Sequence, residues 1–297
     1  MYKKNNKINF FLKDLLPPII LRWVKKKNPS STFEISKVYK SYDVALKKSE
    51  SYEDFITTKV IVAKAKNFSR KLIIDKKIDL MSLRPLIFIL KALKSNTLKV
   101  IDFGGAAGNH YQVVRSVLGN SIKIDWRVVE TKSMVKEALE QELQTEELKF
   151  YNSIAQASNN EVFDLVFSSG AIHHVPNPYE CLQTLASINA SYLILTKTPM
   201  AEQDIVLLQR SLLSENGSGK MPEIGILDKV IRYPVTILNK KKVEEILDSF
   251  GEIELQINEE KKAYQSPSSS YDFSGYVVRK FQKQLWNLVA GLGFEPR

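Results

Sequence analysis

The stretch "VIDFGGAAGNHY", residues 100–111, decides the fold. An apolar run ends in an acid, Asp102, and three glycines follow within five positions, at Gly104, Gly105 and Gly108. Glycine leaves the backbone bare and permits positive φ, so such a turn lets a ligand approach the end of a strand closely. A helix directly after the turn would present N–H groups at its start. We therefore expect a strand, a ligand-binding turn and a helix here.

Around this turn, β-rich runs alternate with helical stretches. The strands expected from this pattern are residues 98–103, 122–130, 148–152, 163–169 and 191–197. Such alternation predicts an α/β fold, in which a mostly parallel, doubly wound sheet is covered by helices on both faces. Residues 251–260 and 271–280 also resemble strands, but no helix separates them. Two strands joined in this way are expected to be antiparallel.

Two kinds of cofactor use a glycine turn of this type. Dinucleotides favour the spacing G-x-G-x-x-G, but starting from Gly104 the sequence has Ala106 and Asn109 where that pattern needs glycines. S-adenosylmethionine (SAM) carries a cationic sulfonium and an amino group, which favour a nearby acid. The sequence fits the second cofactor better, as D-x-G-x-A-x-G from Asp102 to Gly108. Asp102 is then expected to help hold the methionine portion.

The following strands supply further cofactor candidates. Glu130 ends the second strand, where a carboxylate can accept hydrogen bonds from both ribose hydroxyls of an adenosine. Asn152 or Ser153 follows the third strand, where the adenine edge would be read. Phe103 and Ser168, at the ends of the first and fourth strands, complete the predicted cofactor contacts.

These motifs together resemble the class I SAM-dependent methyltransferases. The resemblance is carried by D-x-G-G-x-x-G at 102–108, the acid-tipped "WRVVE" at 126–130 and "FDLVFSSGAIHHV" at 163–175. It covers about residues 97–280 and implies a seven-stranded sheet whose last strand is antiparallel. With "KDLLPP" at 13–18, the chain also looks like a family of bacterial methyltransferases often encoded with surface-polysaccharide genes. That narrower resemblance implies a small-molecule or saccharide acceptor, and suggests a role in polysaccharide biosynthesis.

The catalytic candidates are His173 and His174, which follow the fourth strand. A neutral imidazole there could take the proton from an acceptor hydroxyl, and His174 is slightly favoured. Alternatively, one histidine packs or caps the loop, since alignment of the reactants alone can lower the barrier substantially. "PNPYE", residues 176–180, is interpreted as a helix start with Asn177 as N-cap, and not as an amino-methyltransferase motif. The family resemblance and the absence of that motif together lead us to expect an oxygen acceptor, on a sugar or sugar-linked intermediate.

Composition and charge bear on the cellular compartment of the protein and on the kinds of partner it binds. The single cysteine, Cys181, cannot form an internal disulfide, and no Cys/His cluster suggests zinc, so a cytoplasmic protein without a metal is expected. Residues 1–99 hold 23 Lys and Arg against 8 Asp and Glu, a balance of +15, whereas the remainder has a balance of −5. A basic lobe can attract nucleic acid, but only three of its cations are Arg. A solvated surface is preferred, and a nucleic-acid partner is not expected.

The N-terminal stretch "INFFLKDLLPPIILRWVKKK", residues 8–27, is apolar with a basic end. Lys13, Asp14 and Arg22 interrupt it, so it matches neither a transmembrane span nor a signal peptide. Two interpretations stay open. The stretch packs over the main domain as an arm or lid, or it lies on a membrane surface with its aromatic residues inward, at the inner face of the membrane.

The sequence thus divides into three parts. Residues 1–95 form a basic helical N-terminal extension or lid, with helices expected at 33–48, 52–68 and 82–93. Residues 96–282 form the methyltransferase-like domain, in which 197–233 shows little clear pattern and is expected over the substrate side. Residues 283–297 form a tail. The rival hypotheses are an RNA-modifying methyltransferase and a non-catalytic SAM-binding scaffold at a membrane surface.

Overall fold

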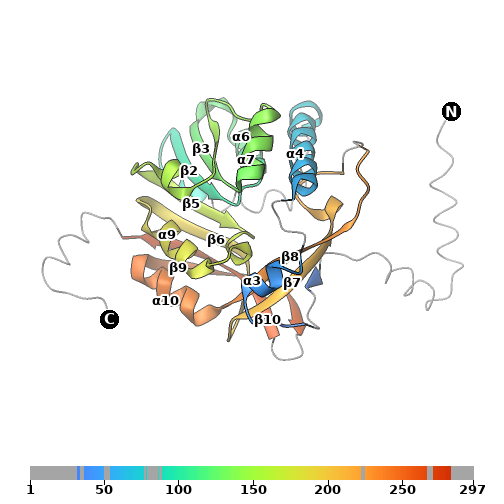
Figure 1. Ribbon diagram of the computed structural model, residues 1–297. Coiled ribbons are helices and arrows are strands. Elements are labelled where there is room, and N and C mark those ends of the chain that lie inside the picture. The colour runs from blue at the N-terminus through green and yellow to red at the C-terminus, as the bar shows by residue number, and fades with distance from the viewer. Residues whose placement is uncertain are drawn as a thin grey trace, which may run out of the picture.

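The computed structural model describes residues 32–33, 37–49, 54–76, 78, 86, 89–221, 225–265 and 270–281. Within these residues, ten strands belong to one sheet (Figure 1). The strands are β1 (Thr32–Phe33), β2 (Thr97–Phe103), β3 (Lys123–Val129), β4 (Leu148–Tyr151), β5 (Phe163–Ser169), β6 (Ala190–Ala201), β7 (Ile205–Leu212), β8 (Val230–Asn239), β9 (Gly251–Gln265) and β10 (Ser270–Lys280).

Seven of these strands form the central sheet, in the order β4-β3-β2-β5-β6-β10-β9. Strands β2 to β6 pair in parallel, and β10 runs antiparallel to both β6 and β9. The predicted fold class, a mostly parallel sheet with an antiparallel last strand, is confirmed. Strand β5 (FDLVFSS) is buried along most of its length, as a strand covered on both faces must be.

Helices cover both faces of this sheet. The described helices are α3 (Tyr42–Leu46), α4 (Phe55–Asp75), α6 (Asn109–Leu118), α7 (Lys132–Glu140), α8 (Ile154–Ser158), α9 (Pro178–Ser187) and α10 (Lys240–Phe250). Helices α6 and α7 pack on one face, in a core centred on Trp126, and α8, α9 and α10 pack on the other. The helix start predicted at 176–180 is confirmed, with Asn177 as N-cap and Pro178 first in α9, although the Asn177 side chain makes no capping bond.

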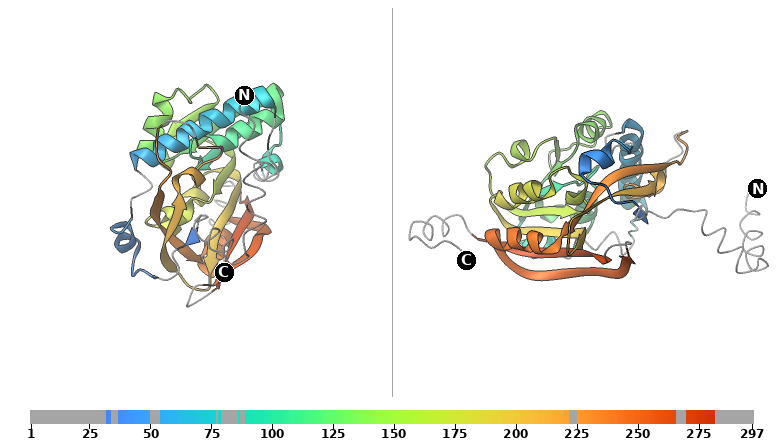
Figure 2. Two further views of the ribbon diagram at one scale, coloured as in Figure 1. Left: turned by 90° about the vertical axis from the view of Figure 1, so that its right-hand side faces the viewer. Right: turned by 60° about the horizontal axis from the view of Figure 1, so that its bottom comes forward.

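Helix α4 packs against α6 and α7, and in the left view of Figure 2 it lies in front of them. Its residues Ile61 and Ala65 pack against Ala107 of the glycine turn and Met134 of α7. Asp54 caps the helix by accepting a hydrogen bond from the Thr57 amide at 3.2 Å. Part of the N-terminal region therefore lies directly over the turn that the sequence singled out.

Of the helix expected at 33–48, only 42–46 is helical among the described residues, so the prediction is wrong at 33, 37–41 and 47–48. Phe33 pairs with Gln209 at the edge of β7, and the Tyr39 amide donates to the Val206 carbonyl at 2.9 Å. Backbone pairing with an open strand edge satisfies these groups and leaves only a short helix, α3. Of the helix expected at 82–93, the described residues Leu86 and 89–92 have helical backbone.

Two strands, β7 and β8, occupy the stretch 197–233 and its continuation, where no clear pattern was found. They form an antiparallel pair, and β8 extends the sheet beside the end of β6, with Met200 opposite Leu238. In the views of Figures 1 and 2 this pair lies on the same side of the molecule as α3 and α4. The hypotheses for the N-terminal arm and the C-terminal tail concern residues outside those described. No helix in the described ranges has the length and apolar character needed to cross a bilayer.

Candidate active site

The glycine turn joins the carboxyl end of β2 to α6. Gly104 and Gly108 have φ values of +71° and +80°, which residues with a side chain rarely adopt. Gly105 is required for a different reason, because a Cβ there would lie 2.4 Å from Oδ2 of Asp102. The turn therefore wraps tightly over the Asp102 carboxylate, and its glycines are needed for packing as well as for access.

Asp102 is fully buried beneath this turn. Its carboxylate accepts a hydrogen bond from Nε1 of Trp126 at 3.0 Å and lies 3.0 Å from Nδ1 of His110. Trp126 lies on β3 and His110 lies near the start of α6, so the Asp102 carboxylate links the end of β2 to both elements and holds the turn in place. Its predicted contact with a methionine portion stays a prediction, and the half-buried His110 at the start of α6 is the group that links Asp102 to the surface.

Glu130 follows β3 and lies beside the same turn. Its carboxylate accepts hydrogen bonds from the amides of Ala106 at 3.0 Å and Thr131 at 2.9 Å. Burial raises the pKa of Glu130, while the two amides lower it and the neighbouring Asp102 raises it further. A carboxylate with two N–H donors still has lone pairs for two hydroxyl groups. The glycine turn and the acid after the second strand are therefore in direct contact, and the role of Glu130 in holding a ribose stays a prediction.

Three buried polar atoms gather near the same edge without a hydrogen-bond partner among the described residues. They are Oγ of Ser168 on β5, Oδ1 of Asn109 at the start of α6, and Nδ1 of His173 after β5. Ser168 is paired in register with Phe103, which packs into the core from the end of β2. Buried polar atoms normally have a partner, so three orphans at one edge suit a site that receives a polar ligand.

The adenine-reading candidates differ in their surroundings. The Ser153 hydroxyl accepts a hydrogen bond from the Gln156 amide at 3.3 Å and so caps α8. Asn152 is exposed after the end of β4. Of the two, Asn152 is the one whose side chain the fold does not use as a helix cap.

His174 is held in one tautomer. Its Nδ1 lies 3.1 Å from the carbonyl oxygen of Pro234 on β8, and a carbonyl only accepts, so Nδ1 carries the proton of the neutral ring. Burial lowers the pKa of His174 to about 4, against the Pro234 carbonyl that raises it. The ring is therefore neutral at pH 7, with Nε2 as its acceptor nitrogen. This is the tautomer that a proton-accepting base needs.

His173 is buried more deeply. Burial, and then the neighbouring His174 ring at 4.1 Å between centroids, hold the pKa of His173 well below its usual range. Both histidines are thus neutral, and His174 contacts β8 through the Pro234 carbonyl and through the Tyr233 ring at 5.1 Å.

Three further residues form or continue the contacts of His174. The Tyr42 hydroxyl of α3 donates to the His174 carbonyl, Tyr233 of β8 meets the His174 ring edge-on, and Lys64 of α4 lies beyond Tyr233. Two of them come from the N-terminal region, more than 100 positions before His174. No spacing in the sequence could have linked them to it.

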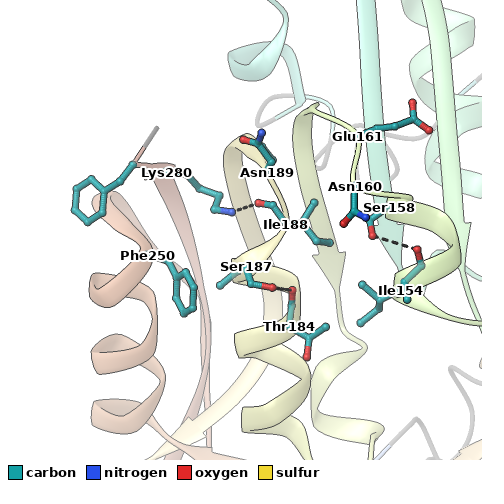
Figure 3. Close-up of a pocket in the computed structure, with 14 residues that line it drawn as sticks. Ile154, Ser158, Asn160, Glu161, Thr184, Ser187, Ile188, Asn189, Phe250 and Lys280 are labelled. Atoms are coloured by element: carbon teal, nitrogen blue, oxygen red, sulfur yellow. Dashed lines mark hydrogen bonds between the residues drawn. The ribbon is translucent and has the colours of Figure 1, made fainter. Parts of the chain in front are cut away.

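A cleft of about 680 Å³ lies at the opposite end of the sheet, beside the amino ends of β5 and β6 (Figure 3). Asn160, Asn189 and Lys280 line it, and Lys280 donates to the Ile188 carbonyl. None of the predicted site residues lines this cleft. The cleft is therefore separate from the site at the glycine turn. Among the described residues there is also no cluster of side chains suited to a metal ion.

Comparison with known proteins gives a structural likeness only. No family model matches the chain, and no curated protein matches its sequence. A SAM-dependent methyltransferase from Methanosarcina mazei aligns over 69% of this chain and 100% of its own, with 13% identity and a TM-score of 0.43. Human N-acetylserotonin methyltransferase in complex with SAM aligns over 77% and 57%, with 12% identity and a TM-score of 0.40. A SAM-dependent methyltransferase from Aquifex aeolicus aligns over 73% and 97%, with 16% identity and a TM-score of 0.36. At these values the likeness does not identify the ligand of this chain.

Proposed function

We propose that this protein is a SAM-dependent methyltransferase that methylates an oxygen atom of a small-molecule or saccharide acceptor. One observation carries the proposal. The glycine turn after β2 and the Glu130 carboxylate after β3 meet at the carboxyl ends of two adjacent parallel strands, joined by the hydrogen bond from the Ala106 amide. Ligands of open α/β sheets bind at this edge, and an acid after the second strand suits the ribose of an adenosine.

The residues present fit SAM. Glu130 would accept the ribose hydroxyls, Asn152 would read the adenine, and Gly104 to Gly108 would let the ligand approach the backbone. Ser168, with its buried unpartnered hydroxyl, would accept a hydrogen bond from the methionine ammonium. When bound, SAM supplies a methyl group on a positively charged sulfur, open to attack by a nucleophile.

A dinucleotide fits this edge less well. Asp102 lies directly under the turn, and Glu130 bonds the turn amide that a phosphate would need. The Asp102 carboxylate directly under the turn disfavours a pyrophosphate there and favours a cationic ligand. The missing glycines at Ala106 and Asn109 point the same way.

His174 is the proposed base, with His173 as the second candidate. The Pro234 carbonyl fixes the His174 proton on Nδ1, so Nε2 is the atom that would receive the proton of an acceptor hydroxyl as its oxygen attacks the methyl carbon. The low pKa of His174 makes it a weak base, which suits proton transfer late in the attack, when the hydroxyl has become acidic. The polysaccharide link and a cytoplasmic location remain part of the proposal.

Calorimetric titration with SAM, S-adenosylhomocysteine and NAD tests the cofactor assignment. Micromolar binding of the first two with no binding of NAD supports it, and binding of NAD alone contradicts it. A screen of sugar nucleotides and glycan intermediates with isotopically labelled methyl groups then tests the acceptor. His174→Asn should bind SAM with unchanged affinity and transfer methyl groups more slowly, and full activity would remove His174 as the base.

A further inference from the structure

Lys64 on α4 is a buried cation with an unusual pair of partners. It is only 1% exposed, and its Nζ donates to the carbonyl oxygens of Ser214 at 2.5 Å and Asn216 at 2.6 Å. Burial lowers the pKa of Lys64 to about 8, while the charges of Asp228 and Glu215 raise it. Burying an ammonium group costs free energy, so a buried lysine at this position suggests a role other than packing.

The segment that Lys64 holds is the loop after β7, residues 213–219. This loop lies directly on α4, because a Cβ at Gly217 would come within 3.1 Å of Ile61, and one at Gly219 within 3.1 Å of the Lys64 carbonyl. Leu213 packs against the same helix through Val60. Helix α4 and the loop therefore pack together, and the buried Lys64 ammonium supplies hydrogen bonds between them.

The Asn216 side chain extends this hydrogen-bond network from the loop to β7 and β8. Its Nδ2 donates to Oγ of Ser211 at 3.0 Å, and its Oδ1 accepts from the Tyr233 hydroxyl at 3.3 Å. The Ser211 and Tyr233 hydroxyls are themselves 3.2 Å apart. All three side chains are buried, so their hydrogen bonds are not exchanged with water and fix the position of the Tyr233 ring.

From Tyr233 the chain of contacts reaches His174. The two rings lie edge to face, with centroids 5.1 Å apart, and the neighbouring Pro234 accepts the hydrogen bond from Nδ1 of His174. A shift of β8 at Tyr233 would therefore change both the ring contact and the hydrogen bond that sets the His174 tautomer.

We infer that Lys64 is a positioning residue for His174, acting through the loop at 213–219, Asn216 and Tyr233. The inference rests on the proposed function only for the task that His174 performs. The coupling itself is a property of the folded chain, and it is measurable without an acceptor. Lys64 touches no reacting atom and acts by holding the β7–β8 pair against α4.

The test uses the imidazole resonances of the protein labelled with 13C and 15N histidine. The chain has three histidines, so His110 outside this network serves as an internal reference. The variants are Lys64→Met, which removes the ammonium, and Lys66→Met, a matched control because Lys66 is an exposed residue of the same helix. Each protein is titrated from pH 8 to pH 5, and its affinity for S-adenosylhomocysteine is measured in parallel.

In the unaltered protein and in Lys66→Met, His174 should stay neutral, with Nδ1 protonated, down to pH 5. In Lys64→Met, loosening of the loop should admit water and raise the apparent pKa of His174 by at least about one unit, with His110 unchanged. An unchanged His174 signal in folded Lys64→Met overturns the inference. Absence of S-adenosylhomocysteine binding in all three proteins would instead contradict the proposed function, while the His174 titration still decides the positioning role.

Tyr233→Phe keeps the test decisive if Lys64→Met does not fold. It removes one hydroxyl from the middle of the network and leaves the ring that contacts His174. A change of the His174 signal in the same direction, smaller in size, supports the inference. If both variants fold, adding Tyr233→Phe to Lys64→Met should add little to the change that Lys64→Met causes alone, because both act through one path. Full additivity of the two changes overturns it.

Discussion

Glu130→Gln should weaken binding of S-adenosylhomocysteine, and the structure sets the size of the effect. Both Glu130 oxygens already accept a backbone amide, from Ala106 at 3.0 Å and Thr131 at 2.9 Å. Glutamine has the same shape but only one acceptor oxygen, so its NH₂ group must face one of these N–H groups or the ligand. The substitution removes one carboxylate acceptor and the negative charge together.

A hydrogen bond to a charged group contributes about 1.5–3 kcal/mol, so loss of one ribose contact should raise Kd roughly 10- to 150-fold. The backbone N–H that loses its acceptor adds a cost to folding of about 1–3 kcal/mol. For a domain of this size that lowers Tm by several degrees. Weaker binding and lower Tm should appear together, because the same carboxylate serves the turn and the ligand.

Calorimetry and thermal unfolding of Glu130→Gln measure the two effects, with Glu140→Gln as the control. Glu140 is an exposed residue of α7 that forms an ion pair with Lys136 one turn away, so its loss should change neither quantity. If folded Glu130→Gln binds S-adenosylhomocysteine as tightly as the unaltered protein, Glu130 does not contact the ribose and the assignment of this edge is wrong.

Three further predictions concern the site and its support. Gly105→Ala would place a Cβ 2.4 Å from the Asp102 carboxylate, so unfolding in denaturant should show a loss of roughly 1–3 kcal/mol; an unchanged midpoint would contradict the tight turn. Trp126→Phe removes the indole donor to Asp102 and should cost about 1–3 kcal/mol, whereas a neutral effect would mean that this bond is unimportant. The His174 pKa of about 4 in the folded state lies below its ordinary value near 6.5, so stability is lost as pH falls from 6.5 toward 4, by at most about 1.4 kcal/mol per unit. His174→Asn should lose less stability than the unaltered protein between pH 7 and pH 5, and an equal loss would refute this.

The sheet was predictable wherever local pattern and tertiary environment agree. Residues 98–103 and 163–169 are short apolar runs bounded by turn residues, and both became buried central strands, β2 and β5. The antiparallel pair near the end was predictable because the ten residues between its strands leave no room for a crossover helix.

The strands β7 and β8 were missed because different parts of the molecule cover the two halves of β8. In β8, α4 covers Ile231 and Tyr233, whereas Val235 and Ile237 pack in another cluster with Tyr271 of β10. These four residues lie on one face of β8, and Pro234, Thr236 and Leu238 on the other face are buried as well, so the apolar–polar alternation of a half-exposed strand is blurred. The short strand β1 was missed because it exists only by pairing with β7.

One part of the candidate site could be predicted from the sequence, and another part could not. The proximity of Gly104, Asp102 and Glu130 follows from strand order, because adjacent parallel strands end at one edge. The partners that hold these groups do not follow from it. His110 and Trp126 reach Asp102 only because α6 and β3 pack beside β2, and Lys64 reaches the loop after β7 only through tertiary contact.

A crystal structure of the protein with S-adenosylhomocysteine is the most direct test of the central claim. The account predicts that the ligand lies along the carboxyl ends of β2 to β5, with its ribose hydroxyls hydrogen-bonded to Glu130 and its amino acid portion near Ser168. Density for the ligand elsewhere, such as in the cleft beside Lys280, would contradict the assignment of the glycine turn as the cofactor site.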